Sequence, residues 1–177
     1  MKTNFNQSNL YRVILSAITV WVTILGTQSH ADTGTSIMNV SATVRHSCSI
    51  DTTPMAFGTY DGVVANASTA LNATATVIST CTSGALVLIT MNVGTSAGSS
   101  SDDAPIRRMT SGAGEYLVYQ VYSDVSREKI WGNISPTGVA VTGTGISQTH
   151  KVYGSIPSGQ MVPEGDYNDQ IIVTITY

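Results

Sequence analysis

Apolar and polar residues alternate with a period of two along most of this chain. The alternating apolar positions are Met38, Val40, Ala42 and Val44; Leu71, Ala73, Ala75 and Val77; Leu117, Tyr119 and Val121; and Ile171, Val173, Ile175 and Tyr177. After the first 31 residues, no stretch keeps a helical period over three turns. Successive side chains of a strand point to opposite faces, so the pattern predicts strands with one buried face. The chain is therefore predicted to be all-β.

The predicted strands are short and are separated by clusters of turn-forming residues. Residues 85–93 form a nearly continuous apolar run, which is typical of a strand buried on both faces or at the centre of a sandwich. Clusters of Gly, Ser, Asn, Asp and Pro occupy residues 61–62, 94–105, 111–114, 135–138 and 157–166. Many short strands with such punctuation predict a β-sandwich, most simply an immunoglobulin-like one.

The N-terminal 31 residues have the pattern of a cleaved export signal. Lys2 and Arg12 give a basic start, residues 13–25 are apolar, and small residues stand at Ser29 and Ala31. The alternative is a membrane anchor, but a membrane-spanning helix needs about 20 apolar residues. We expect residues 1–31 to be a signal peptide, which leaves 146 of the 177 residues, enough for one domain.

The charge of the mature chain argues against a nucleic-acid partner. Without Lys2 and Arg12, six basic residues remain against 11 acidic ones, a net charge of −5. Binding to phosphate backbones needs clustered Lys and Arg, and the sequence has no basic patch.

The two cysteines, Cys48 and Cys81, both lie in the mature part. An exported chain meets an oxidising compartment, so we expect them to form a disulfide. In the chain-entropy model, closing the loop between these two cysteines stabilises the fold by about 4 kcal/mol. The alternatives, a metal-binding pair or a reactive thiol, lack supporting His or Cys neighbours.

Catalytic, metal-binding and cofactor-binding patterns are not found in the sequence. The two mature histidines, His46 and His150, have no metal-site spacing, and there is no nucleophile elbow or phosphate loop. Two Asp pairs, Asp102 with Asp103 and Asp166 with Asp169, lie in polar, turn-rich segments. Asp is common there because its side chain bonds nearby backbone, so we interpret these pairs as turn residues rather than acid–base or calcium sites.

Aromatic residues give no clear sugar-binding platform. Trp131, the single tryptophan of the mature part, is interpreted as a core or strand-edge residue. Tyr116 and Tyr122 share one face of their strand and Tyr119 has the other, so at most two can line up on one surface. We predict that the protein has no small-molecule substrate and no cofactor.

The last alternating segment, residues 171–177, contains neither a charge nor a proline. Proteins normally protect a long apolar strand edge with charges, proline or a covering element. We therefore expect this edge to be covered by another segment or another protein.

Six segments together resemble the spore coat protein U domain and, more narrowly, the pilins of archaic chaperone-usher pili. They are Cys48 shortly after an alternating segment; FGTY at 57–60; Cys81 at the end of the next long strand; VYQVYSD at 118–124; VYGSIP at 152–157; and GDYNDQIIVTITY at 165–177. The likeness spans residues 32–177. Its most specific part is the final segment, whereas the middle of the chain agrees only in pattern.

The resemblance implies an incomplete immunoglobulin-like sandwich that lacks its last strand. Residues 32–44 would be an N-terminal donor-strand extension and residues 45–177 the pilin domain. The donor side chains would be Met38, Val40, Ala42 and Val44, although Ala42 is smaller than expected of a donor residue. The acceptor groove and chaperone contact would include Ile171, Val173, Ile175 and Tyr177. The alternative for the N-terminal segment is an ordinary first strand of its own domain.

The family's partners would be a periplasmic chaperone, an outer-membrane usher and neighbouring subunits. The expected function is that of a non-enzymatic subunit, exported through the periplasm to a cell-surface pilus for attachment and biofilm formation. One alternative is a secreted coat or matrix protein with the same domain. The other is an exported carbohydrate-binding sandwich or enzyme, which needs a complete fold.

Overall fold

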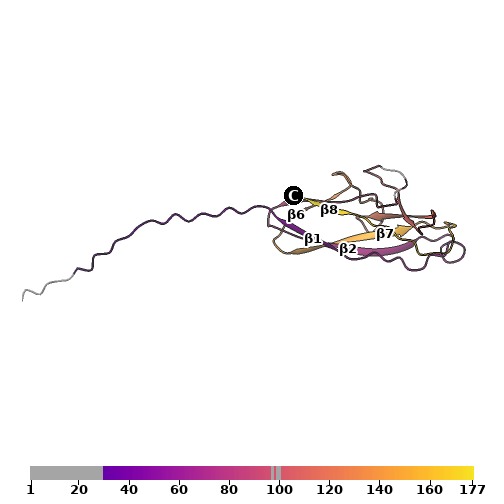
Figure 1. Cartoon of the computed structure of the whole chain (residues 1–177), viewed down its shortest axis with the longest axis horizontal. Coiled ribbons are helices and arrows are strands. Elements are labelled where there is room, and N and C mark those ends of the chain that lie inside the picture. Colours follow the sequence, from indigo (N-terminus) through magenta and orange to yellow (C-terminus); the bar gives the residue numbers. More distant parts are fainter. Residues whose placement is uncertain (1–29, 97, 99–100) are drawn as a thin grey trace, which may run out of the picture. The chain divides into compact units, whose positions relative to one another are not determined.

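The computed structural model describes residues 30–96, 98 and 101–177. Within them the chain forms strands and no helix, and thus no helix long and apolar enough to cross a membrane. The basic start and the apolar run of the predicted signal peptide lie outside these residues. Two units divide between Ser41 and Ala42 and are described separately. The strands, all in the second unit, are β1 (Cys48–Thr52), β2 (Leu71–Cys81), β3 (Leu86–Met91), β4 (Arg107–Thr110), β5 (Tyr116–Tyr122), β6 (Val139–Thr142), β7 (Ser147–Ile156) and β8 (Val173–Thr176) (Figure 1).

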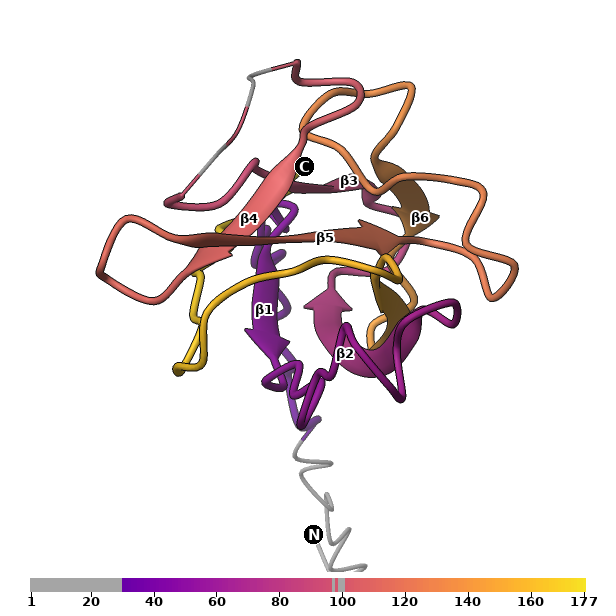
Figure 2. The ribbon, with the colours of Figure 1, turned by 90° about the vertical axis from the view of Figure 1, so that its right-hand side faces the viewer.

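The strands form two antiparallel sheets. The larger sheet has the order β1-β2-β7-β5-β4 and the smaller one the order β6-β3-β8. The longest pairing joins β2 to β7, from Leu71 opposite Ile156 to Thr80 opposite Ser147. Strands β4 and β5, both labelled in Figure 2, pair antiparallel from Arg107 opposite Tyr119 to Thr110 opposite Tyr116. The prediction of an all-β sandwich is confirmed.

A disulfide closes one end of the larger sheet. Cys48, the first residue of β1, stands directly opposite Cys81, the last residue of β2. Their sulfur atoms are bonded, which confirms the predicted pair. The bond fixes β1 beside β2 at the point where the chain enters the domain.

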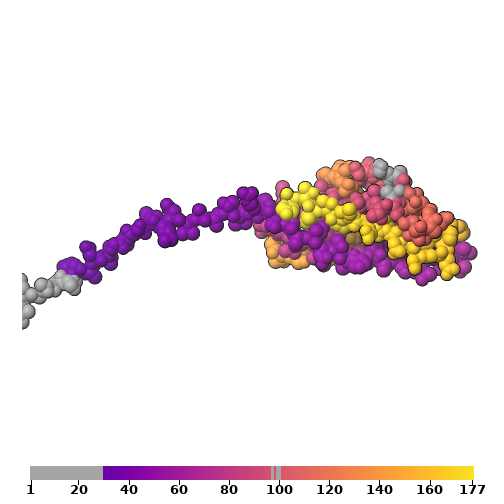
Figure 3. Space-filling view, in the orientation of Figure 1, coloured from indigo at the N-terminus to yellow at the C-terminus, as the bar shows by residue number. Residues whose placement is uncertain are grey.

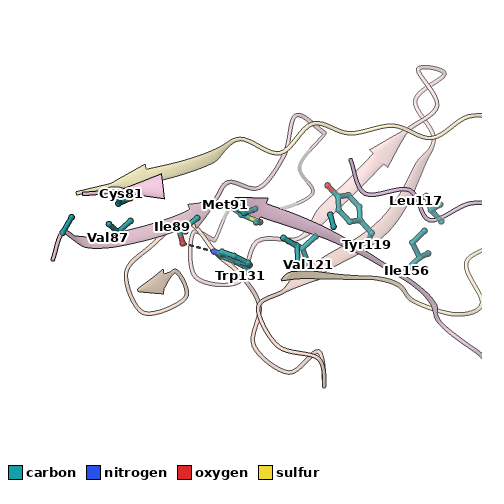
Figure 4. Packing of buried hydrophobic residues seen from close by; sticks show 13 residues of the cluster. Cys81, Val87, Ile89, Met91, Leu117, Tyr119, Val121, Trp131 and Ile156 are labelled. Atoms are coloured by element: carbon teal, nitrogen blue, oxygen red, sulfur yellow. Dashed lines mark hydrogen bonds between the residues drawn. The ribbon is translucent and has the colours of Figure 1, made fainter. Parts of the chain in front are cut away.

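The core lies between the two sheets and follows the predicted alternation. Its buried residues are Ala75, Val77, Cys81, Ala85, Val87, Ile89, Met91, Leu117, Tyr119, Val121, Trp131, Val152 and Ile156. Trp131 is 1% exposed, and its indole N–H donates to the carbonyl of Ile89 at 2.8 Å (Figure 4). Trp131 is thus a core residue. Tyr119 is buried whereas Tyr116 and Tyr122 are not, as the parity of β5 predicts.

For residues 85–93, the alternative of a strand at the centre of the sandwich holds, because β3 lies between β6 and β8, whereas burial on both faces does not. Leu86, at the start of β3, is 80% exposed because the outer face of the smaller sheet is uncovered there. Further along the same face Thr90 is buried, since Gly138 packs closely on it. The apolar run thus reflects one buried face and a second face that is only partly covered.

Candidate functional site

Strand β8 has a single partner in the described part of the chain. It pairs with β3, from Leu88 opposite Thr176 to Met91 opposite Val173, and no strand lies along its other edge. Val173 and Ile175 are half-buried and pack against the core, while Thr174 and Thr176 are exposed. The smaller sheet therefore ends in a strand with one unpaired edge and an apolar inner face.

One side of the sandwich is closed by the segment that leads into β8. Thr110 in β4 and Asn168 exchange two backbone hydrogen bonds of 2.9 and 3.0 Å. Asn92, after β3, accepts at its side-chain oxygen from the N–H of Ile172 at 2.8 Å. The segment thus crosses from the β4 edge of the larger sheet to the smaller sheet. The side between the edges of β1 and β8 has no backbone bridge among the described residues.

A groove of about 290 Å³ opens on that unbridged side. One wall is formed by the segment after β1, with Met55 and Phe57, and the other by Ile171 and Val173. The floor is the core itself, contributed by Ala75, Val77, Met91, Tyr119, Val121 and Val152. Figure 3 shows the C-terminal segment, in yellow, running along the domain beside the purple atoms of the β1 and β2 region.

The groove continues into a wider hollow between residues 55–63 and 160–168. Met55, Phe57, Met109, Tyr167 and Asn168 line both parts. The continuous depression therefore runs from the β8 edge to the end of the domain at which β2 begins. Its lining combines apolar side chains, such as Met55 and Phe57, with polar ones, such as Asn168 and Gln160.

Asp169 supports the wall of the groove through contacts that sequence reasoning missed. Its carboxylate accepts from the hydroxyl of Tyr119 at 2.6 Å, from the N–H and hydroxyl of Thr95, both at 2.8 Å, and from the N–H of Ser96 at 3.3 Å. A Cβ on Gly94, whose φ is 88°, would lie 2.1 Å from that carboxylate. The interpretation of Asp169 as a local turn residue is therefore wrong, because its partners lie some 50 to 74 residues away in the sequence.

Arg107 is a fully buried cation beneath the same wall. Its guanidinium donates to the carbonyls of Met91, Asn92 and Trp131 and, at 2.6 Å, to the side chain of Gln120. Burial lowers the pKa of Arg107 to about 10, and the nearby Tyr119 and Asp169 act in the opposite direction. The side chain is thus charged at neutral pH and ties β4 and β5 to the end of β3. An arginine at the start of a four-residue strand gives no sequence signal for such a role.

Residues 30–47 contain neither helix nor strand. Met38, Val40 and Val44 are 85%, 86% and 83% exposed, Ala42 is also exposed, and Ile37 on the other parity is 90% exposed. Exposed apolar side chains gathered in one segment are typical of a site that another protein covers. The assignment of these side chains as donors, and of Ile171, Val173, Ile175 and Tyr177 as acceptors, stays a prediction. Of the four acceptors, Tyr177 is 56% exposed and the other three pack on the core.

The remaining candidates form no reactive centre. His150 and the hydroxyl of Ser79 are 2.9 Å apart, and His46 is exposed. Asp103 bonds to Ser101 and to the N–H of Ala104, as expected of a turn residue. In the described ranges, no three His, Cys, Asp or Glu side chains gather as metal ligands.

Comparisons with known proteins agree with this architecture. The chain is 36% identical to "Protein U" of Myxococcus xanthus over 178 residues, which cover 96% of this chain and 99% of that protein. Its fold matches a chain in the crystal structure of the CsuC–CsuE chaperone–tip adhesion subunit pre-assembly complex from archaic chaperone-usher Csu pili of Acinetobacter baumannii. That match has a TM-score of 0.54 and 19% identity, and covers 76% of this chain but only 40% of the other. The model of the Spore Coat Protein U domain matches residues 34–174. The chain therefore belongs to the spore coat protein U domain family.

Proposed function

We propose that this protein is a non-enzymatic structural subunit of a chaperone-usher type pilus that polymerises by donor-strand complementation. The observation that carries the proposal is the unpaired edge of β8 beside a groove whose floor is the hydrophobic core. Addition of an extended segment to an open sheet edge gains backbone hydrogen bonds, and pockets for alternate side chains give specificity.

The occupant of the groove is the N-terminal extension of a second copy. Nine residues, Ser36–Val44, span about 30 Å when extended. Burying the three larger side chains Met38, Val40 and Val44, at roughly 1.5 to 3 kcal/mol each, contributes roughly 5 to 9 kcal/mol before entropy costs. Ala42 adds little. All four have one parity, as does the apolar set of residues 171–177, so one face of the added strand meets one face of the groove.

The partners follow from the same need for a covered edge. Before assembly, a periplasmic chaperone covers β8 by lending a strand, and an outer-membrane usher then exchanges that strand for the extension of the next subunit. The support for a chaperone is that the structural neighbour belongs to a chaperone–subunit complex of a pilus. The protein is exported through the periplasm to the cell surface, where the fibre serves attachment and biofilm formation.

Expression in a periplasm tests this proposal. Residues 32–177 are produced alone and then with a candidate chaperone, and yield and size are compared. A one-to-one complex that rescues soluble protein is expected. A shortened chain that lacks residues 32–44 is expected to bind the chaperone but to form no fibres by itself. A protease-resistant monomer obtained without a partner would contradict the proposal, as would full fibres from the shortened chain.

A secreted coat or matrix protein is the second candidate, favoured by the family description and by the 36% identity to Protein U. The same groove and extension serve such a protein if copies associate without an usher. The discriminating observation is whether chaperone and usher genes lie beside this gene. Assembly from purified subunits in a strain without an usher would favour the coat protein.

A further inference from the structure

The two ends of the folded domain, residues 42–177, differ in charge and both carry exposed apolar side chains. We call the end where β1 begins at Cys48, β2 ends at Cys81 and β7 begins at Ser147 the disulfide end. The opposite end, where β2 begins at Leu71 and β7 ends at Ile156, we call the loop end. Arg45 and His46 lie at the disulfide end, whereas Glu164 and Asp166 lie in the exposed segment at the loop end.

The loop end is a platform joined by hydrogen bonds between two loops. The hydroxyl of Tyr60 donates to the carbonyl of Pro157 at 2.7 Å and accepts from the N–H of Gln160 at 2.9 Å. The N–H of Gly159 donates to the carbonyl of Asn66 at 2.8 Å. Gly62 packs so tightly on Gln160 that an added Cβ would lie 2.1 Å from its carbonyl oxygen. This surface is therefore held in one shape.

Exposed apolar side chains stand on both ends. On the platform, Val63, Val64 and Met161 are 70%, 76% and 71% exposed. At the disulfide end, Ile146 is 71% and Leu86 is 80% exposed. The N–H of Gly145 is held by the carbonyl of Cys81 at 2.9 Å, so the turn that carries Ile146 is tied to the end of β2. Apolar groups on a fixed surface are typical of a site that another protein covers.

We propose that successive copies make a second contact, in which the disulfide end of one copy packs on the loop end of the next. The inference rests on the proposed donor-strand function and names a surface outside the groove. Three residues, 45–47, separate the donor residue Val44 from Cys48 of the same copy, and they span about 10 Å at most. A donor strand therefore brings its own domain against the domain that receives it.

Charge indicates which end of the receiving domain contacts the disulfide end of the donating copy. If the donor strand runs antiparallel to β8, its last residues lie at the start of β8, toward the loop end. Arg45 and His46 then approach Glu164 and Asp166, and Ile146 approaches the platform. If the donor strand runs parallel to β8, its last residues lie near Thr176, at the disulfide end of the receiving copy. The disulfide ends of the two copies then meet, and the basic residues of one copy face those of the other. Opposite charges favour the first arrangement.

Cross-linking in assembled protein tests the contact. In the mature chain, Ile146→Cys and Met161→Cys are introduced together and the assembly is treated with a short bis-maleimide. Both side chains are exposed, so folding is expected to be unaffected, and mass spectrometry checks that Cys48 and Cys81 stay paired. The matched control is Ile146→Cys with Lys151→Cys, since Lys151 is also exposed but lies in the middle of β7, between the two ends.

The expected result is a ladder of covalent multimers from the first pair and none from the control. Assembled fibres that give no ladder would overturn the second contact and leave donor-strand assembly intact. Dimers from Ile146→Cys alone would show that like ends meet, and would overturn it as well. If the unmodified chain fails to assemble with its chaperone and usher present, the donor-strand proposal itself is wrong and the contact falls with it.

Discussion

The hydroxyl of Tyr119 donates a hydrogen bond of 2.6 Å to the carboxylate of Asp169, which lies 50 residues further along the chain. Tyr119 lies in β5 of the larger sheet, and Asp169 precedes β8 of the smaller one. Burial and the bond to Asp169 raise the pKa of Tyr119, so the phenol stays a donor throughout the physiological range. The bond thus holds the segment that forms one wall of the groove against the core.

Tyr119→Phe is expected to lower the free energy of unfolding by about 2 kcal/mol, the range for a hydrogen bond to a charged group. The ring stays packed, and only the donor is lost. Urea unfolding of residues 32–177, followed by the fluorescence of the buried Trp131, measures the change. The control is Tyr122→Phe, because Tyr122 is half-buried and its hydroxyl bonds to no residue in the described part of the chain. Equal effects of the two substitutions would contradict the role of this bond.

Arg107→Lys is expected to cost about 3 kcal/mol, because one ammonium group cannot replace the planar fork of donors. The guanidinium reaches Met91, Asn92 and Trp131 on one side and Gln120 on the other. Lysine keeps the charge but leaves buried carbonyls without a donor. The same unfolding assay applies. Arg108→Lys, at a half-buried neighbour stacked on Tyr116, is expected to cost less than about 1 kcal/mol. A cost of less than about 1 kcal/mol for Arg107→Lys as well would mean that the hydrogen bonds around this side chain rearrange to accept lysine.

The alternation of apolar residues was sufficient to predict the sandwich, since β2, β5 and β8 each bury one parity. The strands β4 and β6 were not predicted, because neither alternates apolar with polar residues: β4 reads RRMT and β6 reads VAVT. The cysteine pair could be predicted because the chain contains just two cysteines. The contacts of Arg107 and Asp169 could not be predicted, because they join residues that only the folded topology brings together. The groove could not be predicted either. It arises because β8 has no partner on its outer edge, and this depends on the order of strands in the sheet, which the local sequence does not show.

Stability is expected to fall as the pH decreases from about 7 toward about 5, through His150. Burial lowers the pKa of this imidazole below its ordinary value of 6.5, and Ser79 lies within hydrogen-bond distance. The unfolded chain then binds more protons than the folded one between the two pKa values. The stabilisation is therefore fully present above pH 6.5 and is lost as the pH falls through the folded-state pKa. Unfolding midpoints across this range measure the effect.

In His150→Gln the same pH series is expected to be flatter, because the titrating group is gone while a polar side chain remains beside Ser79. His46→Gln serves as the control, since His46 is exposed and outside every strand. An unchanged slope in His150→Gln would assign the pH dependence to other groups.

Donor-strand assembly predicts that substitutions in the extension act by parity. Val40→Asp would place a carboxylate in the apolar groove, whereas Ser41→Asp would place one on the outer face of the added strand. Burying an unpaired carboxylate costs several kcal/mol. At about 1.4 kcal/mol per factor of ten, we expect Val40→Asp to weaken subunit association by two orders of magnitude or more and Ser41→Asp to have little effect.

The groove supplies the complementary test of parity. Ile175 is half-buried against the core and Thr174 is exposed, although they are neighbours in β8. Ile175→Asp is expected to block assembly even with an unmodified donor, and Thr174→Asp to permit it. Sedimentation and electron microscopy of chains that carry each substitution measure fibre formation, and circular dichroism checks that each chain folds. Equal fibre yields from Val40→Asp and Ser41→Asp would mean that the extension does not enter the groove with its even-numbered face. The unpaired edge of β8 would then need a different occupant.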